Sequence, residues 1–130
     1  MTTQTQPDVR HTIAAYFAAV RAMDVEAWLR TFATDAVSHD PSAPPLRGHD
    51  ALRQFFIGIA GAFQQLTLTE DDVFVTGQGA AVKWTGRGVG KNGRRVTFEG
   101  IDLFEFAADG TIQTLCAYWD PASMMTQLQR

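Results

Sequence analysis

The chain contains 130 residues, a length that accommodates one domain of ordinary size, so we expect a single domain over residues 1–130. Hydrophobic residues make up 45% of it and charged residues 19%, which excludes a disordered or fibrous protein. Fourteen acidic against eleven basic residues give a formal net charge of −3, and this balance argues against nucleic acid or an anionic membrane as a partner.

The first part of the chain has the three- and four-residue spacing of apolar side chains that predicts amphipathic helices. Pro7 and Asp8 mark the start of a first helix, which continues to about Met23. Asp24 is the expected N-cap of a second, short helix that includes Phe32.

An extended segment is expected next, from Ala36 to Asp40, because Pro41 disfavours helical geometry in the residue before it. Residues 41–48 have the composition of a loop. A third helix is then predicted from about His49 to Phe63.

After this helix the spacing of apolar residues changes from about 3.6 to 2, which is typical of strands. Short glycine-containing segments separate the strands and favour hairpins, so we expect an antiparallel meander. The four predicted strands are Leu66–Thr76, Ala80–Val89, Arg94–Ala107 and Thr111–Asp120. A short polar tail, residues 121–130, follows them. These elements predict an α+β fold in which three N-terminal helices pack on one face of a curved, mainly antiparallel sheet.

Asp102 interrupts an apolar stripe on the third predicted strand, because alternation places it on the same face as Phe98 and Phe104. An ionised carboxylate there would cost several kcal/mol, so we expect a raised pKa and a neutral carboxyl group that donates a hydrogen bond. Alternation also allows a carboxylate paired with arginine or placed at the mouth of a barrel. A reversed sheet would instead expose Asp102 and bury Glu99 and Glu105.

Two further polar residues occupy positions where a functional group could face a cavity. Tyr16 lies on the apolar face of the first helix, where a buried hydroxyl needs a partner; a core tyrosine bonded to a main-chain carbonyl is the alternative. Asp40 stands at a strand end before a proline-rich loop, where its carboxylate can point into a cavity. An Asp-Pro step that only initiates a turn is the alternative.

Two sets of residues, one in each half of the chain, form a recognisable pattern. The first comprises Tyr16, Met23–Ala27, Phe32–Ala36, Asp40–Pro41, Pro44–Pro45 and Gly48. The second comprises Gly100–Phe104, Asp109–Thr114 and Ala117–Trp119. Together they resemble the bacterial steroid Δ5-3-ketoisomerases over nearly the whole chain, with the weakest match from about Leu66 to Lys91. The resemblance implies the cone-shaped α+β barrel shared with nuclear transport factor 2. It also implies a homodimer, because members of that superfamily often pair through the exposed face of the sheet.

The resemblance implies roles for three residues, as they are known for this family. Asp40 would remove a proton from the carbon between a ketone and an alkene and return it two carbons further along. Tyr16 and neutral Asp102 would donate hydrogen bonds to the dienolate oxygen. The expected partner is a small apolar ketone or another hydrophobic ligand, with no cofactor. The residues expected to contact it are Phe56, Phe98, Phe104, Leu115 and Trp119.

The surroundings of Tyr16 depart from the isomerase pattern. Where isomerases of this kind can carry tyrosines that bond to the oxyanion-hole tyrosine, this chain has Phe32 and Phe56. The loop between Asp40 and Gly48 is also one residue short. Two other functions therefore stay open: a polyketide-cyclase-like enzyme that uses Asp40 on a different carbon acid, and a non-catalytic ligand-binding or dimerisation domain.

The other sequence motifs predict no further chemistry. The glycines of residues 88–93 match G-x-G-x-x-G, but a strand follows them instead of the helix that would receive a pyrophosphate. His11, His39 and His49 lie on different elements, so no metal site is expected. The single cysteine, Cys116, excludes an internal disulfide, and no run approaches the ~20 apolar residues of a membrane span. We therefore expect a cytoplasmic protein with no membrane partner.

Overall fold

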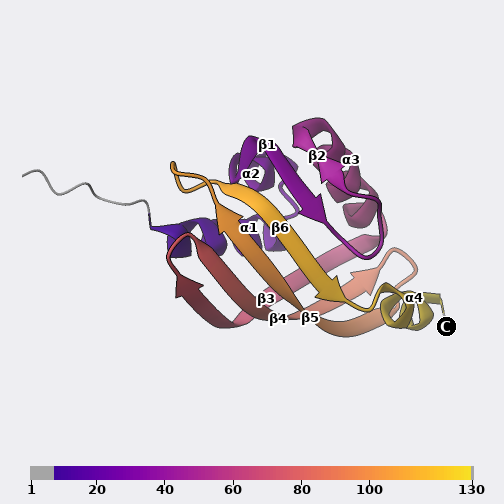
Figure 1. The fold of residues 1–130 in the computed structure, drawn as a ribbon. Helices are drawn as coiled ribbons and strands as arrows, with labels where there is room; N and C mark the ends of the chain where they lie inside the picture. The colour runs from indigo at the N-terminus through magenta and orange to yellow at the C-terminus, as the bar shows by residue number, and fades with distance from the viewer. Residues whose placement is uncertain (1–7, 130) are drawn as a thin grey trace, which may run out of the picture.

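The computed structural model describes residues 8–129, which form four helices and six strands (Figure 1). In chain order these are α1 (Val9–Ala22), α2 (Val25–Arg30), β1 (Phe32–His39), β2 (Leu46–Arg47), α3 (Gly48–Ala60), β3 (Phe63–Thr76), β4 (Gly79–Gly90), β5 (Arg95–Phe106), β6 (Ile112–Trp119) and α4 (Pro121–Gln129). The described helices include none that is long and apolar enough to cross a membrane.

The six strands form one sheet in the order β2-β1-β6-β5-β4-β3. Strands β3 to β6 pair with their neighbours in chain order and antiparallel, which confirms the predicted meander. Strand β1 adds to it by pairing parallel with β6, and the short β2 pairs antiparallel with β1. The sheet is curved and cone-like. Because β2 and β3 remain at its two edges, it is not closed into a barrel.

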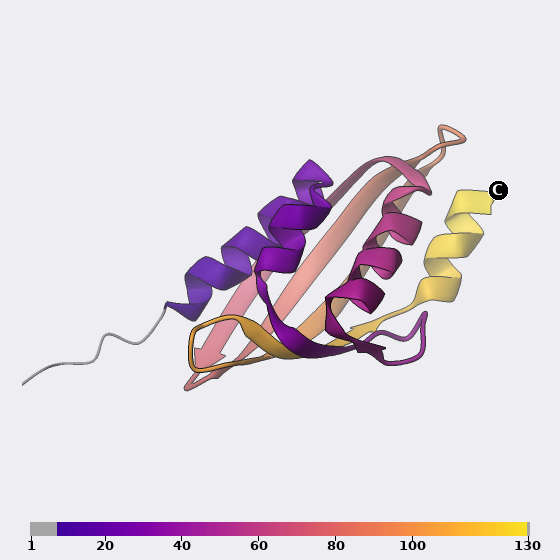
Figure 2. The same cartoon turned by 90° about the horizontal axis from the view of Figure 1, so that it is seen from above.

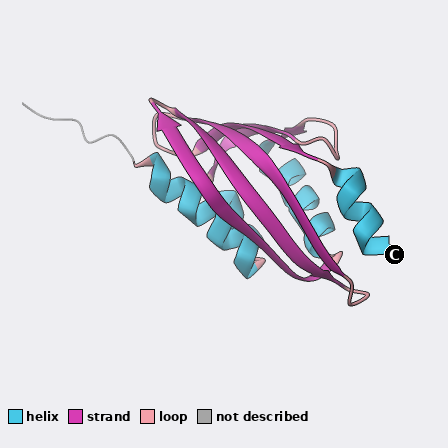
Figure 3. Cartoon of the chain, turned by 90° about the horizontal axis from the view of Figure 1, so that it is seen from below, coloured by secondary structure: helices cyan, strands magenta, loops and turns pink. Residues whose placement is uncertain are grey.

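The helices lie on one side of the sheet (Figure 2), and the view from the opposite side shows the long strands uncovered (Figure 3). Helix α1 packs on β3 and α2, α3 packs on β1, and α4 packs on β5. This arrangement confirms an α+β fold with helices on the inner face of a curved sheet. The core between the two layers is aromatic and aliphatic, and its largest fully buried side chains are Phe17, Phe104, Ile13, Leu52, Ile112 and Val82.

Local signals set the starts of the first two helices. The side chain of Asp8 accepts a hydrogen bond from the main-chain N–H of Arg10, and that of Asp24 accepts one from Ala27 at 3.0 Å. Between the helices Met23 adopts left-handed geometry with φ of 54°, which ends α1 and turns the chain. The N-cap predicted at Asp24 is confirmed, whereas Pro7 lies outside the described residues.

Two expectations about element boundaries were wrong. Phe32 begins strand β1 instead of belonging to the second helix, because it pairs with Ile112 of β6 and is buried there. Phe63 likewise begins β3, since α3 ends at Ala60. The positions of both aromatic residues are compatible with a helix and with a strand. Pairing with strands that are distant in the sequence favours the strand in each case.

The polar tail expected after the last strand is the helix α4, residues Pro121–Gln129. Met124 and Leu128, one helical turn apart, are its buried residues. The helix is held to β5 by Gln127, whose side chain accepts a hydrogen bond from the main-chain N–H of Thr97 and donates one to its carbonyl, both at 2.9 Å. Met124, Met125 and Leu128 are too few apolar side chains to give a periodic signal that predicts a helix. Packing against β5 stabilises the helix in the folded protein.

Alternation along β5 is as predicted, with Val96, Gly100, Asp102, Phe104 and Phe106 buried. The outer face of the sheet carries both apolar and polar side chains. Its exposed apolar side chains are Phe74, Ile101, Leu103 and Tyr118.

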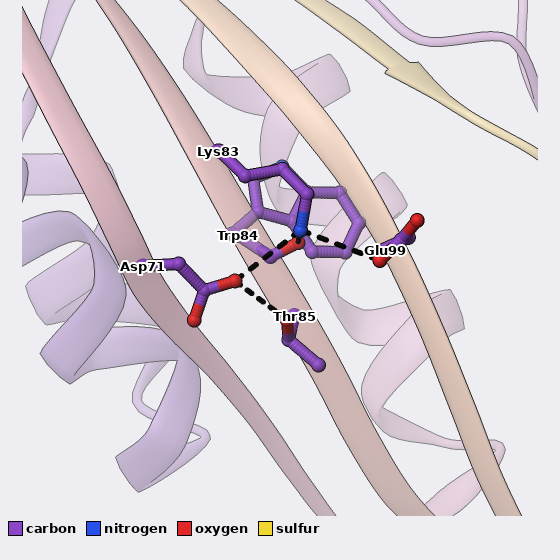
Figure 4. Close-up of polar contacts among 5 residues, drawn as sticks. All are labelled: Asp71, Lys83, Trp84, Thr85 and Glu99. Carbon is purple, nitrogen blue, oxygen red and sulfur yellow. Dashed lines mark hydrogen bonds and ion pairs between the residues drawn. The ribbon is translucent and has the colours of Figure 1, made fainter.

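A polar cluster lies beside them on the outer face (Figure 4). Lys83 of β4 contacts Asp71 of β3 at 3.3 Å and Glu99 of β5 at 3.4 Å, and its ammonium also donates to the carbonyl of Trp84. The hydroxyl of Thr85 donates to Asp71 at 2.6 Å. These contacts join three neighbouring strands on the face opposite the helices and hold the main chain at Trp84.

Candidate active site

A cavity of about 100 Å³ lies between the helices and the inner face of the sheet. Tyr16, Asp40 and Asp102 all line it, although they come from α1, the loop after β1, and β5. Apart from these groups and Ser38, its walls are predominantly apolar. The structure therefore brings the three polar residues singled out in the sequence into one apolar space.

Asp102 is buried on the inner face of β5, with 3% of its surface exposed. Burial raises the pKa of its carboxyl from 3.8 to about 7, and the negative charge of Asp40 adds to this effect. The indole N–H of Trp84 acts in the opposite direction and favours the ionised form. Below neutral pH the carboxyl is therefore largely protonated and can donate a hydrogen bond. Among residues 8–129 no arginine pairs with Asp102, and the sheet is not reversed, since Asp102 is buried while Glu99 and Glu105 are exposed.

Tyr16 projects from the buried face of α1 into a cluster of aromatic rings. Its ring centroid lies 5.0 Å from that of Phe17, 5.4 Å from Phe104, 5.9 Å from Trp28 and 6.0 Å from Phe32. Burial first, and the charges of the two cavity carboxyls second, raise the pKa of its hydroxyl well above 10. The phenol therefore stays protonated and is available as a donor.

Asp40 follows the last residue of β1 and is only half-buried. Its Oδ1 accepts hydrogen bonds from the main-chain N–H of Ser42 at 2.9 Å and from the Ser42 hydroxyl at 2.6 Å. Its Oδ2 accepts one from the indole N–H of Trp119 at 3.2 Å. The turn expected at the Asp-Pro step is present in these contacts, and the same carboxyl group also faces the cavity.

Four of the five residues predicted to contact a ligand line the cavity: Phe56, Phe98, Leu115 and Trp119. The fifth, Phe104, does not. It is buried behind Tyr16 and stacks on Phe106 at a centroid distance of 5.9 Å. Alternation puts Phe104 on the correct face of β5, but its position along the strand lies beyond the cavity, inside the core.

Sequence reasoning missed two tryptophans of the cavity wall, Trp28 and Trp84. The indole N–H of each is buried and has no hydrogen-bond partner within the described residues. An unpaired buried donor costs about 1–3 kcal/mol, so each calls for an explanation. The signal in the sequence is weak, because a tryptophan at a core position of a helix or strand is usually part of the packing.

The arrangement brings together two kinds of group across an apolar space. Asp40 is a carboxylate that can accept a proton, and Tyr16 and Asp102 are protonated groups that can donate hydrogen bonds to a developing negative charge. Their different surroundings explain the difference in role, since Asp40 has three donors around it and Asp102 is enclosed by apolar walls. Such a site is suited to moving a proton on an apolar carbonyl compound.

Comparison with known proteins gives matches over most of the chain. Residues 13–114 match the SnoaL-like domain family. The chain is 30% identical over 119 residues to a protein described as steroid Δ-isomerase from Nocardioides simplex, covering 91% of this chain and 94% of that protein.

Solved structures share the fold. An NTF2-like protein of unknown function from Burkholderia pseudomallei superimposes with a TM-score of 0.84 at 21% identity, covering 94% of this chain and 98% of that one. SalBIII, described as an epoxide hydrolase/cyclase-like enzyme of pyran ring formation in salinomycin, gives a TM-score of 0.78 at 23% identity, covering 88% and 92%.

Proposed function

Because this chain belongs to the SnoaL-like family, of the NTF2-like fold, we propose that it is an acid–base enzyme of the ketosteroid-isomerase type that moves a proton on a small apolar ketone. The observation that carries the proposal is the contrast between two carboxyl groups of one cavity. Asp102 has a pKa raised to about 7 by burial, whereas Asp40 accepts hydrogen bonds from Ser42 and Trp119. A proton shuttle needs both a neutral donor and a free base in the same space.

In this reaction the Asp40 carboxylate takes a proton from the carbon between the ketone and the alkene. The electrons of that C–H bond form a dienolate, whose oxygen accepts hydrogen bonds from the Tyr16 hydroxyl and the Asp102 carboxyl. Asp40 then returns the same proton to the carbon at the far end of the dienolate, which gives the conjugated ketone. Atoms and charge balance without a cofactor, and the two donors stabilise the charge where it develops.

The size of the cavity supports a small substrate. Its volume of about 100 Å³ is below the ~300–1,000 Å³ that is typical of pockets enclosing drug-sized ligands. A four-ring steroid would require the walls to move apart, whereas a one- or two-ring ketone requires little movement. Its apolar lining favours a substrate whose only strong polar group is the carbonyl.

The test is turnover of β,γ-unsaturated ketones of increasing size, from cyclohex-3-enone to 5-androstene-3,17-dione, followed by the ultraviolet absorbance of the conjugated product. We expect the wild-type protein to convert the small ketones and Asp40→Asn to lose about 10²–10⁴-fold in kcat. Asp35→Asn is the matched control, because Asp35 lies exposed on β1, the strand that Asp40 follows, and accepts a hydrogen bond from Gln113 outside the cavity. It should keep the wild-type rate.

Other outcomes separate the alternative functions. Turnover of aromatic polyketide esters, but of none of the ketones, would replace the isomerase by a cyclase on the same site. Binding of a phenolic probe without turnover of either class would indicate a ligand-binding domain. Equal rates for Asp40→Asn and Asp35→Asn would contradict the role of Asp40.

A further inference from the structure

The two unpaired indole N–H groups belong to the same cavity as the proposed oxyanion hole. Trp28 is 4% exposed and Trp84 is 3% exposed, and both residues line the cavity. Within residues 8–129 neither ring nitrogen has a hydrogen-bond partner. Trp119, the remaining tryptophan, does have one, namely Asp40. The cavity wall therefore contains two donors whose role the proton transfer described above does not explain.

Trp28 occupies the space beside Tyr16 that lacks supporting hydroxyl groups. Its ring centroid is 4.7 Å from that of Phe32, 5.0 Å from Phe56 and 5.9 Å from Tyr16. Phe32 and Phe56 carry no side-chain polar atom, so the only N–H donor among these three rings is the indole of Trp28. A donor at this place can bond to the Tyr16 oxygen while the phenol hydrogen is directed elsewhere.

Trp84 lies beside Asp102, as Trp28 lies beside Tyr16. In the ladder between β4 and β5, Asp102 is opposite Val82 and Trp84 is opposite Gly100, so Trp84 and Asp102 are diagonal neighbours on the inner face. Gly100 leaves room for the indole, since a Cβ there would lie 2.5 Å from Cζ2 of Trp84. On the outer face Lys83 donates to the Trp84 carbonyl and holds this part of β4 (Figure 4).

The pKa shifts of Tyr16 and Asp102 agree with this placement of the two indoles. The indole N–H of Trp28 opposes the rise in the pKa of Tyr16, and that of Trp84 opposes the rise in the pKa of Asp102. A group lowers the pKa of an acid in this way when it donates toward the oxygen that carries the charge. The pKa shifts therefore agree with an indole N–H beside each acid, although neither indole nitrogen has a hydrogen-bond partner within the described residues.

We propose that Trp28 and Trp84 are positioning residues of the oxyanion hole, Trp28 donating to the hydroxyl oxygen of Tyr16 and Trp84 to the carboxyl oxygen of Asp102. This proposal rests on the proposed function of the site. When Tyr16 and Asp102 donate to an anionic oxygen, their own oxygens gain negative charge, and the two indole bonds shorten in response. Trp28 would thereby replace the supporting tyrosines that this chain lacks at Phe32 and Phe56.

A double-mutant cycle on ligand affinity tests the Trp28 half. The probe is 2-naphthol, a phenol that presents its oxygen as the dienolate would, and its dissociation constant is measured by calorimetry. Trp28→Phe should weaken binding about three- to tenfold in the wild-type background and have no further effect in Tyr16→Phe. Phe63→Leu, which removes an apolar ring from the cavity wall, is the matched control and should give additive effects. Additive effects for Trp28→Phe as well would overturn the proposal.

The Trp84 half follows the same design with Asp102→Leu as the second variant, because leucine removes the acceptor and keeps the branched arrangement of heavy atoms. Trp84→Phe should weaken binding of 2-naphthol in the wild type and not in Asp102→Leu. An equal loss in both backgrounds would mean that Trp84 contacts the ligand directly or only fills space, which overturns its positioning role.

The NMR resonances of the indole N–H groups test the proposal without catalytic turnover. They also avoid any tryptophan substitution, which could prevent folding. Uniform ¹⁵N labelling yields three indole cross-peaks, one for each tryptophan. Addition of 2-naphthol should move the Trp28 and Trp84 protons downfield, and Tyr16→Phe should abolish the shift of Trp28 alone. If the Trp28 proton responds equally with and without the Tyr16 hydroxyl, the proposal fails. A protein that shows these shifts but converts no ketone would refute the proposed enzymatic function and leave the hydrogen-bond network in place.

Discussion

The indole N–H of Trp119 donates a hydrogen bond of 3.2 Å to Oδ2 of Asp40, which joins the end of β6 to the loop that follows β1. Oδ1 accepts two hydrogen bonds from Ser42, so Oδ2 is the oxygen with more free capacity to accept a proton. Trp119 thus fixes the orientation of the proposed base as well as forming part of the cavity wall.

We expect Trp119→Phe to lower kcat roughly tenfold, because it removes one hydrogen bond to a charged carboxylate and leaves that carboxylate less well oriented. Steady-state kinetics on the best ketone substrate measures the effect. Tyr118→Phe is the control, since Tyr118 precedes Trp119 on β6 but is exposed on the outer face. Unchanged kcat in Trp119→Phe would show that Asp40 does not need this bond.

The pH dependence of catalysis should follow the ionisation of Asp102. With a pKa of about 7 in the folded protein, its carboxyl loses its proton as the pH rises through neutrality and then repels the dienolate instead of donating to it. We expect kcat/KM to fall with increasing pH above about 7 in the wild type. In Asp102→Asn this fall should be absent, with a rate roughly 10²–10³-fold lower at pH 6. A fall of equal size in both proteins would assign it to another group.

The same ionisation should appear in the stability of the protein. Folding raises the pKa of Asp102 from 3.8 to about 7, so the unfolded chain loses this proton first and the folded state is favoured less as the pH increases. The contribution is fully present below pH 4 and is lost by about pH 7, which amounts to about 4 kcal/mol. Urea unfolding of the wild type and Asp102→Asn at several pH values measures it. The difference in their free energies of unfolding should decline by this amount, and a constant difference would contradict the raised pKa.

Gly100 should be sensitive to the addition of a single methyl group. A Cβ at this position would lie 2.5 Å from Trp84, 2.6 Å from the main-chain oxygen of Tyr118 and 2.8 Å from Cβ of Trp119. Gly100→Ala should therefore destabilise the protein by about 1–3 kcal/mol and displace both tryptophans, which fluorescence can follow. Gly58→Ala on α3 is the control, because no atom lies within 4 Å of the added carbon; it should stabilise the helix by about 1 kcal/mol. Equal effects of the two substitutions would rule out crowding at Gly100.

Much of the fold and the main polar residues of the cavity could be predicted because they depend on local rules. A strand alternates its side chains strictly, so the apolar residues around Asp102 determine that it points inward. The side chain of Asp24 caps a helix through a bond to a residue three positions away, and glycine-containing turns connect neighbouring strands. The catalytic roles, the homodimer and the cytoplasmic location stay predictions, since they rest on the resemblance or on composition.

Other features depended on contacts between segments far apart in the chain. Phe32 belongs to a strand because it pairs with Ile112 of β6. Helix α4 is stabilised because it packs on β5. Whether a buried aromatic ring meets a cavity or another ring is likewise decided by distant elements: Phe98 lines the cavity, whereas Phe104, six residues further along the same strand, packs behind Tyr16. The sequence by itself determined which side chains face inward, because that depends only on backbone periodicity. Only the tertiary structure decided which of them surround an empty space, because a cavity is the volume left where packed helices and a curved sheet do not meet.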